Sequence, residues 1–226
     1  MSNSVTGIVS WTTPVVINSG DVVAAADLNA LNKDVAFFRA RPYTIVVQTG
    51  APTSATLTNS TDLSAANGKV LFATANGGTI ATSASTSAVG AISLLSTGAL
   101  STPSTLAGLY EVKCQMMTNA ANGSHIRVSA ILLDSTATQI GSIPGDWANT
   151  ATDHNAISSV SFTIPFNVAG SYFGNVASVK FIGQYVGSSA MTLNVGDLNG
   201  NGPGSTPPQY NTFASIEYLG TSSGAY

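Results

Sequence analysis

The chain has 226 residues and a formal net charge of −3, and its mean hydropathy is +0.26. Hydrophobic residues make up 44% of it and charged residues only 8%, against about 25% charged residues in an average soluble domain. Such a chain is too apolar to be intrinsically disordered. It also has too little charge to keep a lone monomer dispersed, so we expect much of its surface to be uncharged or covered by partner subunits.

Nucleic acid and membranes are not expected partners. The seven basic residues are scattered, whereas phosphate binding needs clustered Lys and Arg. The first residues, MSNSVTG, lack the basic and apolar regions of a secretory signal, and no apolar run reaches the roughly 18 residues of a spanning helix. The single cysteine, Cys114, excludes an intrachain disulfide. These features predict a protein that is made and assembled in a cytoplasm.

Residues 1–20 are predicted to form an extended arm. β-branched residues and Trp11 fill most of positions 7–17, but Pro14 interrupts them. A proline within a strand pattern indicates an edge strand or an arm rather than a central strand. The turn residues at positions 18–20 end this segment.

Residues 24–39 are predicted to form one short α-helix. Its apolar residues recur at spacings of three, four and three, which aligns them in one stripe. The stripe consists of Leu28, Leu31, Val35 and Phe38. Pro42 stops the helix, because the residue before a proline avoids the helical region. The stripe must pack against something: it either covers its own domain or joins two further copies in a short central bundle.

Beyond residue 43 the pattern is one of strands and turns. The predicted strands are residues 44–48, 69–74, 109–118, 124–134, 158–166, 178–186, 190–195 and 213–219. Residues 79–105, rich in Ser, Thr and Ala, are either a long loop or a pair of weak edge strands. Many short strands separated by turn residues indicate a β-sandwich or jelly roll.

Residues 109–118 and 124–134 are predicted to pair as a hairpin. Apolar and polar residues alternate in both, and the Asn122-Gly123 doublet between them favours a two-residue turn. Cys114 falls on the apolar face of the first strand and His125 on the polar face of the second.

No catalytic or zinc-binding pattern is complete. The two histidines, His125 and His154, have no second His or Cys at ligand spacing, so we expect both to be solvated. Cys114 is expected to act as a small core hydrophobe, because no activating histidine shares its face.

The acidic residues are too thinly spread to predict polysaccharide hydrolysis, which needs two carboxylates at a sugar-binding cleft. The richest region holds Asp146, Trp147 and Asp153, where Trp147 could stack on a sugar, although such a loop more often caps a sandwich.

Residues 197–202 match the opening of a calcium loop, but Pro208 stands where a bidentate glutamate is needed. An exposed turn is the ordinary interpretation there, with a different kind of cation site as the alternative. We expect no enzyme activity and no cofactor.

Two parts of the chain resemble proteins of tailed-phage particles. The first, between Trp11 and Pro42, combines W-T-T-P-V with G-D-V-V-A-A-A-D-L-N and resembles N-terminal attachment segments of virion proteins. The second, residues 106–220, opens with G-L-Y-E-V and closes with S-I-E-Y-L-G. It is similar to trimeric jelly rolls of the C1q/tumour-necrosis-factor type.

The resemblance implies a mainly β protein: a jelly-roll or β-sandwich knob preceded by an extended arm and one short α-helix. It divides the chain into an attachment and trimerisation segment, residues 1–42, and a knob, residues 43–226, with its core at about 106–220. A homotrimer with an N-terminal anchor is implied. The candidate interface residues are Trp11, Leu28, Leu31, Val35 and Phe38.

The leading hypothesis is a capsid decoration, or cement, protein of a virion, assembled in the host cytoplasm. Its partners would be its own copies and the major capsid protein or another virion protein, held by apolar contacts that change little with salt. The alternative is a tail or head fibre that recognises the host surface through loops carrying Trp147, Tyr210 and residues 197–202. A polysaccharide depolymerase is the third, disfavoured hypothesis.

Overall fold

The computed structural model describes residue 29 and residues 41–48, 53–57, 69–76, 80–84, 91–118, 125–149, 156–186, 191–195 and 212–220. Asn29 is helical and exposed, but the rest of the predicted arm and helix lies outside the described residues. So do all five candidate interface residues and several other positions singled out above. These are Trp11, Leu28, Leu31, Val35 and Phe38, the Asn122-Gly123 turn, Asp153, His154, residues 197–202, Pro208 and Tyr210. No helix among the described residues is long and apolar enough to cross a membrane.

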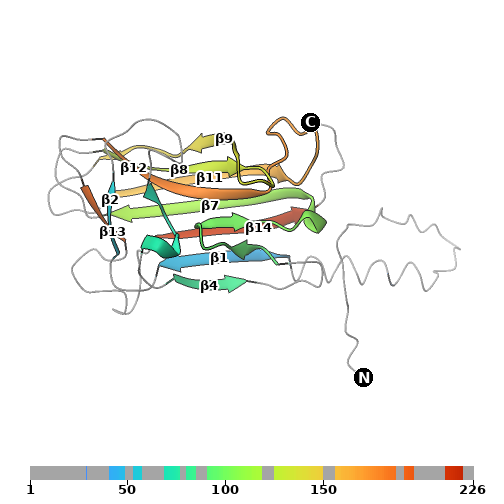
Figure 1. The fold of residues 1–226 in the computed structure, drawn as a ribbon, viewed down its shortest axis with the longest axis horizontal. Coiled ribbons are helices and arrows are strands. Elements are labelled where there is room, and N and C mark those ends of the chain that lie inside the picture. Colours follow the sequence, from blue (N-terminus) through green and yellow to red (C-terminus); the bar gives the residue numbers. More distant parts are fainter. Residues whose placement is uncertain are drawn as a thin grey trace, which may run out of the picture.

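The described residues form β-strands and two 3-10 helices, at Thr74–Asn76 and Ser104–Leu106 (Figure 1). The strands are β1 (Tyr43–Gln48), β2 (Thr53–Leu57), β3 (Lys69–Val70), β4 (Ile80–Ala84), β5 (Ser93–Leu94), β6 (Ala99–Ser101), β7 (Gly108–Thr118), β8 (His125–Leu133), β9 (Gln139–Pro144), β10 (Ala148–Asn149), β11 (Ala156–Phe166), β12 (Ser178–Val186), β13 (Met191–Val195) and β14 (Phe213–Gly220).

Two antiparallel sheets make up the sandwich. The five-stranded sheet has the order β11-β7-β14-β1-β4. The seven-stranded sheet has the order β10-β8-β12-β6-β5, with β9 also pairing β8 and β3 also pairing β12. β2 and β13 form a separate two-stranded ladder.

The strand pairing is nested. β1 pairs β14, β6 pairs β12, β7 pairs β11 and β8 pairs β9, so early strands meet late strands in reverse order. The β7–β14 and β8–β12 ladders then join these pairs within each sheet. A double sheet wound in this way is a jelly roll. The predicted fold class, a mainly β jelly-roll sandwich, is confirmed.

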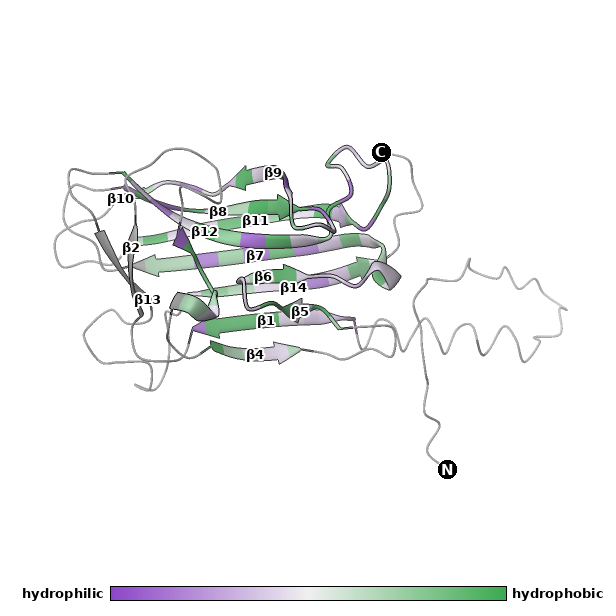
Figure 2. Ribbon diagram, viewed as in Figure 1, coloured by the Kyte–Doolittle hydropathy of each residue, from purple (hydrophilic) through white to green (hydrophobic). Residues whose placement is uncertain are grey.

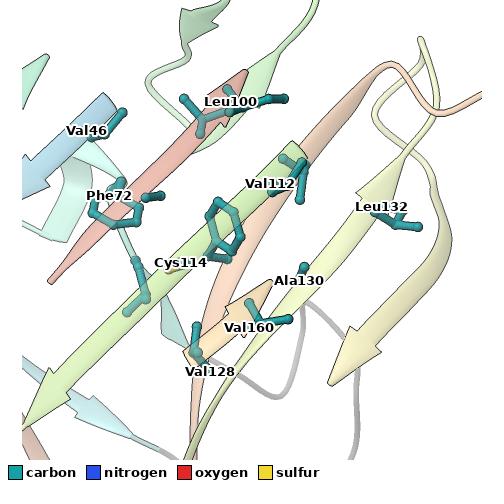
Figure 3. Packing of buried hydrophobic residues seen from close by; sticks show 14 of the residues in the cluster. Val46, Phe72, Leu100, Val112, Cys114, Val128, Ala130, Leu132 and Val160 are labelled. Atoms are coloured by element: carbon teal, nitrogen blue, oxygen red, sulfur yellow. The ribbon is translucent and has the colours of Figure 1, made fainter. Parts of the chain in front are cut away.

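The core lies between the two sheets (Figure 3). Val46, Val112, Cys114 and Val160 enter it from the five-stranded sheet, and Leu100, Val128, Ala130 and Leu132 enter it from the seven-stranded sheet. Every second residue of a strand faces one side, so the alternating apolar residues of β7, β11 and β14 all reach this space. The hydropathy colouring of the strands shows the same alternation (Figure 2).

The predicted hairpin of residues 109–118 with 124–134 is wrong in its pairing. Both strands exist, as β7 and β8, but they belong to different sheets. β7 pairs with β11 and β14, while β8 pairs with β12 along its whole length. The physical reason is that the two apolar stripes face each other across the core instead of lying side by side on one sheet. An alternating pattern and a turn doublet look the same in the sequence whether the two strands pair in one sheet or face each other across the core.

The polar face predicted for β8 is also wrong, because Arg127 and Ser129 are buried. Ile131 and Leu133 on the same face form a second, smaller apolar cluster with Ala99 and Ile182, against which Val70 packs. The outer side of β8 is therefore covered as well as its inner side. Its first residue, His125, is exposed, as expected.

Residues 79–105 contain edge strands, which was one of the two alternatives. β4 lies at the edge of the five-stranded sheet and β5 at the edge of the seven-stranded sheet, while β6 pairs β12 inside it. The predicted strand 69–74 is shorter than expected, since only Lys69–Val70 is strand and a 3-10 turn follows.

Candidate functional site

Cys114 lies in the core, as expected. Its cross-strand partners are Val160 on β11 and Ala214 on β14, and burial raises the pKa of its thiol well above the ordinary value. A buried neutral thiol is a poor nucleophile. Among the described residues, no three His, Cys, Asp or Glu side chains gather where they could hold a metal ion.

The segment between β9 and β10 carries Trp147 along the edge of the seven-stranded sheet. β9 pairs the second half of β8 and β10 pairs its beginning, so the segment interrupts one edge strand. Gly145 bridges the gap by donating its N–H to the Val128 carbonyl, at 2.9 Å. A side chain at Gly145 would overlap the carbonyl oxygens of Val128 and Ser159, so this close approach requires glycine.

Ser158 on β11 fastens the same segment to both sheets. Its hydroxyl donates to the carbonyl of Asp146, at 2.7 Å, and accepts the N–H of Val128, at 2.9 Å. Asp146 in turn donates its N–H to the carbonyl of Ser159, at 3.2 Å. Groups on two strands, β8 and β11, therefore fix the position from which the Trp147 side chain leaves the chain.

Arg127 lies beneath the Trp147 ring. The guanidinium carbon is 4.2 Å from the ring centroid, which is a cation–π contact. Arg127 Nε donates to Gln184 Oε1 at 3.1 Å, and the Ser129 hydroxyl donates to the same oxygen at 2.9 Å. Burial lowers the pKa of Arg127, but an arginine remains protonated in proteins. The indole is thus held from one side by a cation that is itself anchored.

A pocket of about 470 Å³ opens next to this ring and is lined mainly by apolar surface. Its lining residues are His125, Trp147, Asn149 and Val186. The strand register explains why they meet, since Asn149 of β10 and Val186 of β12 are the two cross-strand partners of His125 on β8. His125 Nδ1 and Asn149 Oδ1 are hydrogen-bonded. Pockets of this size are typical of small-molecule sites.

A second exposed aromatic group lies on the loop between β11 and β12. Tyr172 is 89% exposed and stacks edge-on against Phe173, with ring centroids 5.5 Å apart. The loop is held in shape by backbone hydrogen bonds and by Asn167, whose amide donates to Thr102 Oγ1 at 2.8 Å. The two rings form an exposed tip, which suits contact with a partner surface.

The outer face of the five-stranded sheet carries a third apolar feature, the β1 outer patch, defined as Tyr43, Ile45, Val47 and Phe213. Tyr43 is 37% and Ile45 38% exposed. Val47 and Phe213 are cross-strand partners on β1 and β14. Apolar surface of this kind commonly marks a protein contact.

The structure brings together two residues that the sequence analysis considered separately. Trp147 was a candidate for host recognition and His125 was only expected to be solvated, yet both line the pocket. Asn149, Val186 and the supporting Arg127 and Gln184 were not predicted. They come from three strands, and no spacing along the chain connects them.

Comparisons with known proteins add likenesses of fold. No family model matches the chain, and no curated protein matches it. Among solved structures, the chain is similar to the Eiger TNF of S. frugiperda, with 10% identity and a TM-score of 0.42, over 82% of this chain and 98% of that one. It is also similar to a chain of infectious bursal disease virus, Gx strain, with 10% identity and a TM-score of 0.38, over 81% of this chain and 38% of that one.

Proposed function

We propose that this protein is a non-enzymatic structural protein of a bacteriophage virion, a trimeric jelly-roll knob that decorates and cements the capsid. The observation that carries the proposal is the outer face of the five-stranded sheet. On this face the apolar β1 outer patch and the exposed hydroxyl-bearing residues Ser159, Ser161 and Thr163 of β11 lie on opposite sides of β7 and β14, whose outward residues include Glu111, Lys113 and Glu217. Within this face, the β1 outer patch suits burial against other subunits, because its four side chains are apolar and carry no charge to desolvate.

In this proposal the knobs associate through the β1 outer patch, and residues 1–42 attach them to the major capsid protein or another virion protein. The arm would add a strand to an exposed sheet edge, and Trp11, Leu28, Leu31, Val35 and Phe38 would bury apolar area. In a trimer, three arms that each bind weakly give a strong overall attachment. Once the first arm is bound, binding of the second and third is intramolecular. Assembly would take place in the host cytoplasm.

Particle stoichiometry tests the cement function. Purified particles with this protein labelled should carry hundreds of copies spread over the head, and deletion of residues 1–42 should abolish attachment while the β-domain still folds. A small multiple of three or six copies at the tail would contradict a cement role. Decoration by the truncated protein would contradict the anchor.

Oligomeric state tests the β1 outer patch. The unaltered protein should sediment as a trimer in analytical ultracentrifugation, and Ile45→Lys should shift it toward monomer because the patch would have to bury a charge. Tyr172→Lys places the same charge on the exposed β11–β12 loop and should leave the trimer intact. A monomeric wild-type protein, or equal effects of the two variants, would contradict this arrangement.

Host recognition is the second candidate function, as a tail or head fibre tip. The pocket beside Trp147 favours it, since a capsid cement needs no concave site of this size. Binding of the purified protein to host cells, absent for a Trp147→Ala variant, would support this function over cement alone.

A further inference from the structure

We propose that the pocket lined by His125, Trp147, Asn149 and Val186 binds an uncharged saccharide unit. This inference goes beyond the cement function and does not depend on it, since the pocket belongs to the folded knob wherever that knob is attached. It deepens the host-recognition alternative by naming the class of ligand.

The first argument is the platform. Trp147 is 40% exposed, although Arg127 lies over its ring at 4.2 Å. The cation therefore occupies one side of the indole while other parts of it remain open to solvent. A sugar ring presents a flat face of C–H groups, and a large aromatic surface with an apolar body suits that face. Val186 extends the apolar surface on the neighbouring strand.

The second argument is preorganisation. An exposed tryptophan on a free loop would lose conformational entropy on binding, but here the chain on both sides of it is fixed. Gly145 and Asp146 are hydrogen-bonded to β8 and β11, and Ala148 and Asn149 pair with the start of β8. A site that is already held in shape keeps more of its contact energy as affinity.

The third argument is the polar edge. In the tautomer in which His125 Nδ1–H donates to Asn149 Oδ1, Nε2 is an acceptor, and the Asn149 amide carries N–H donors. Sugar hydroxyls both donate and accept, so one donor and one acceptor side by side match a pair of neighbouring hydroxyls. A small-ligand site usually combines a few polar groups with a mostly apolar wall.

The fourth argument is charge. Among the residues that the structure describes around the pocket, none that lines it is Lys, Arg, Asp or Glu, and the nearby guanidinium of Arg127 is directed to the indole and to Gln184. The chain as a whole is negative, at −3. A neutral hexose or N-acetylhexosamine therefore fits better than a sialic or uronic acid, whose carboxylate would seek a paired cation.

Ligand-observed NMR on the full-length protein tests the proposal. The probes are the methyl glycosides of glucose, galactose, mannose and N-acetylglucosamine, with sialic acid as the charged comparison. At least one neutral glycoside should show saturation transfer from the protein, and sialic acid should not. Tryptophan fluorescence in a Trp11→Phe background, which leaves Trp147 as the only tryptophan, should change on titration with the same sugar.

Three variants locate the binding. Trp147→Ala should weaken affinity at least about tenfold, which corresponds to the loss of an aromatic contact of about 1.4 kcal/mol. Asn149→Ala, at an exposed position, should weaken it severalfold and serves as the second test if Trp147→Ala disturbs folding. Tyr172→Ala removes a more exposed aromatic ring elsewhere and should bind like the wild type.

Three outcomes would overturn the proposal. One is the absence of any saccharide signal from the wild-type protein. Another is equal binding by all three variants. The last is a loss of particle attachment in Trp147→Ala without sugar binding by the wild type, which would assign the pocket to an apolar side chain of a virion partner. None of them contradicts the cement function.

Discussion

The outer faces of the two sheets obey the same alternation but meet different surroundings. On the five-stranded sheet, the outward residues of β11 (Ile157, Ser159, Ser161 and Thr163) are exposed. On the seven-stranded sheet, the outward residues Arg127, Ser129 and Gln184 are buried and hydrogen-bonded to one another. Alternation fixes which residues share a face, but a face is exposed only where no other part of the chain covers it.

The difference has an energetic consequence. Polar side chains on an exposed face are hydrated in the folded and in the unfolded state alike. Substituting them therefore changes the free energy of unfolding little. Polar residues on a covered face have lost their water and depend on their partners. The Gln184 cluster, defined as Arg127, Ser129 and Gln184, should therefore behave as a second core.

The largest expected effect follows from removing the shared acceptor of this cluster. Gln184→Ala should lower the free energy of unfolding by about 2–4 kcal/mol, because Arg127 Nε and the Ser129 hydroxyl lose a buried acceptor and one of these bonds is to a charge. Urea denaturation followed by circular dichroism measures it. Ser161→Ala, outward on the other sheet, should change it by less than about 0.5 kcal/mol. If Gln184→Ala and Ser161→Ala lowered the free energy of unfolding by similar amounts, the distinction between the covered and the exposed outer face would be wrong.

A smaller effect is expected where the two sheets are tied together. Ser158→Ala should cost about 1–3 kcal/mol, since the buried N–H of Val128 loses its side-chain acceptor. Its neighbour Ser159 points outward and is exposed, so Ser159→Ala is the matched control and should be near neutral. The same urea titrations compare them. A neutral Ser158→Ala would mean that its hydrogen bonds do not fasten the Trp147 segment.

The smallest effect is expected at the solvated turn between β8 and β9. Asp134 accepts hydrogen bonds from the Thr136 hydroxyl and from the N–H groups of Thr136 and Thr138, and these bonds lower the pKa of its carboxyl. A lowered pKa in the folded state means that the carboxylate stabilises the protein above its unfolded pKa of about 3.9 and that this stability is lost as the pH falls through the folded value.

Asp134→Asn should therefore lower the urea midpoint slightly at pH 7 and by less at pH 2, because protonation of Asp134 removes the difference in charge as the pH falls. Midpoints measured at the two pH values test the sign. A midpoint difference of the same size at both pH values would show that the effect comes from the shape of the side chain and not from the charge of the carboxylate.

The strands that were predicted correctly are those with long alternating patterns. β7, β11, β12 and β14 each carry this signal within their own residues, and local alternation needs no knowledge of partners. β9 and β10 were missed. β9 contains Gly141 and ends at Pro144, two residues that weaken a strand pattern, and β10 is only two residues long. β9 and β10 are strands because they pair with β8, and not because of a pattern in their own residues.

The candidate site was predicted in one residue only. Trp147 stood out because it lies next to Asp146 and near Asp153, where an aromatic ring could stack on a sugar. His125 and Val186 are 61 positions apart in the sequence, and they become neighbours only because β8 and β12 pair in one register. The alternating pattern puts Arg127 on the polar face of its strand, and the covering of that face leaves no trace in β8 itself.

By itself, the sequence determined that this protein is mainly β, that its strands bury one apolar face each, and that Cys114 belongs to the core. Local alternation and composition carry that information. Only the tertiary structure decided that β7 and β8 face each other across the core, that the outer side of β8 is covered, and that Trp147 meets His125 beside a pocket. Those outcomes depend on pairing between strands distant in the chain, where the free energy of the whole sandwich selects the register.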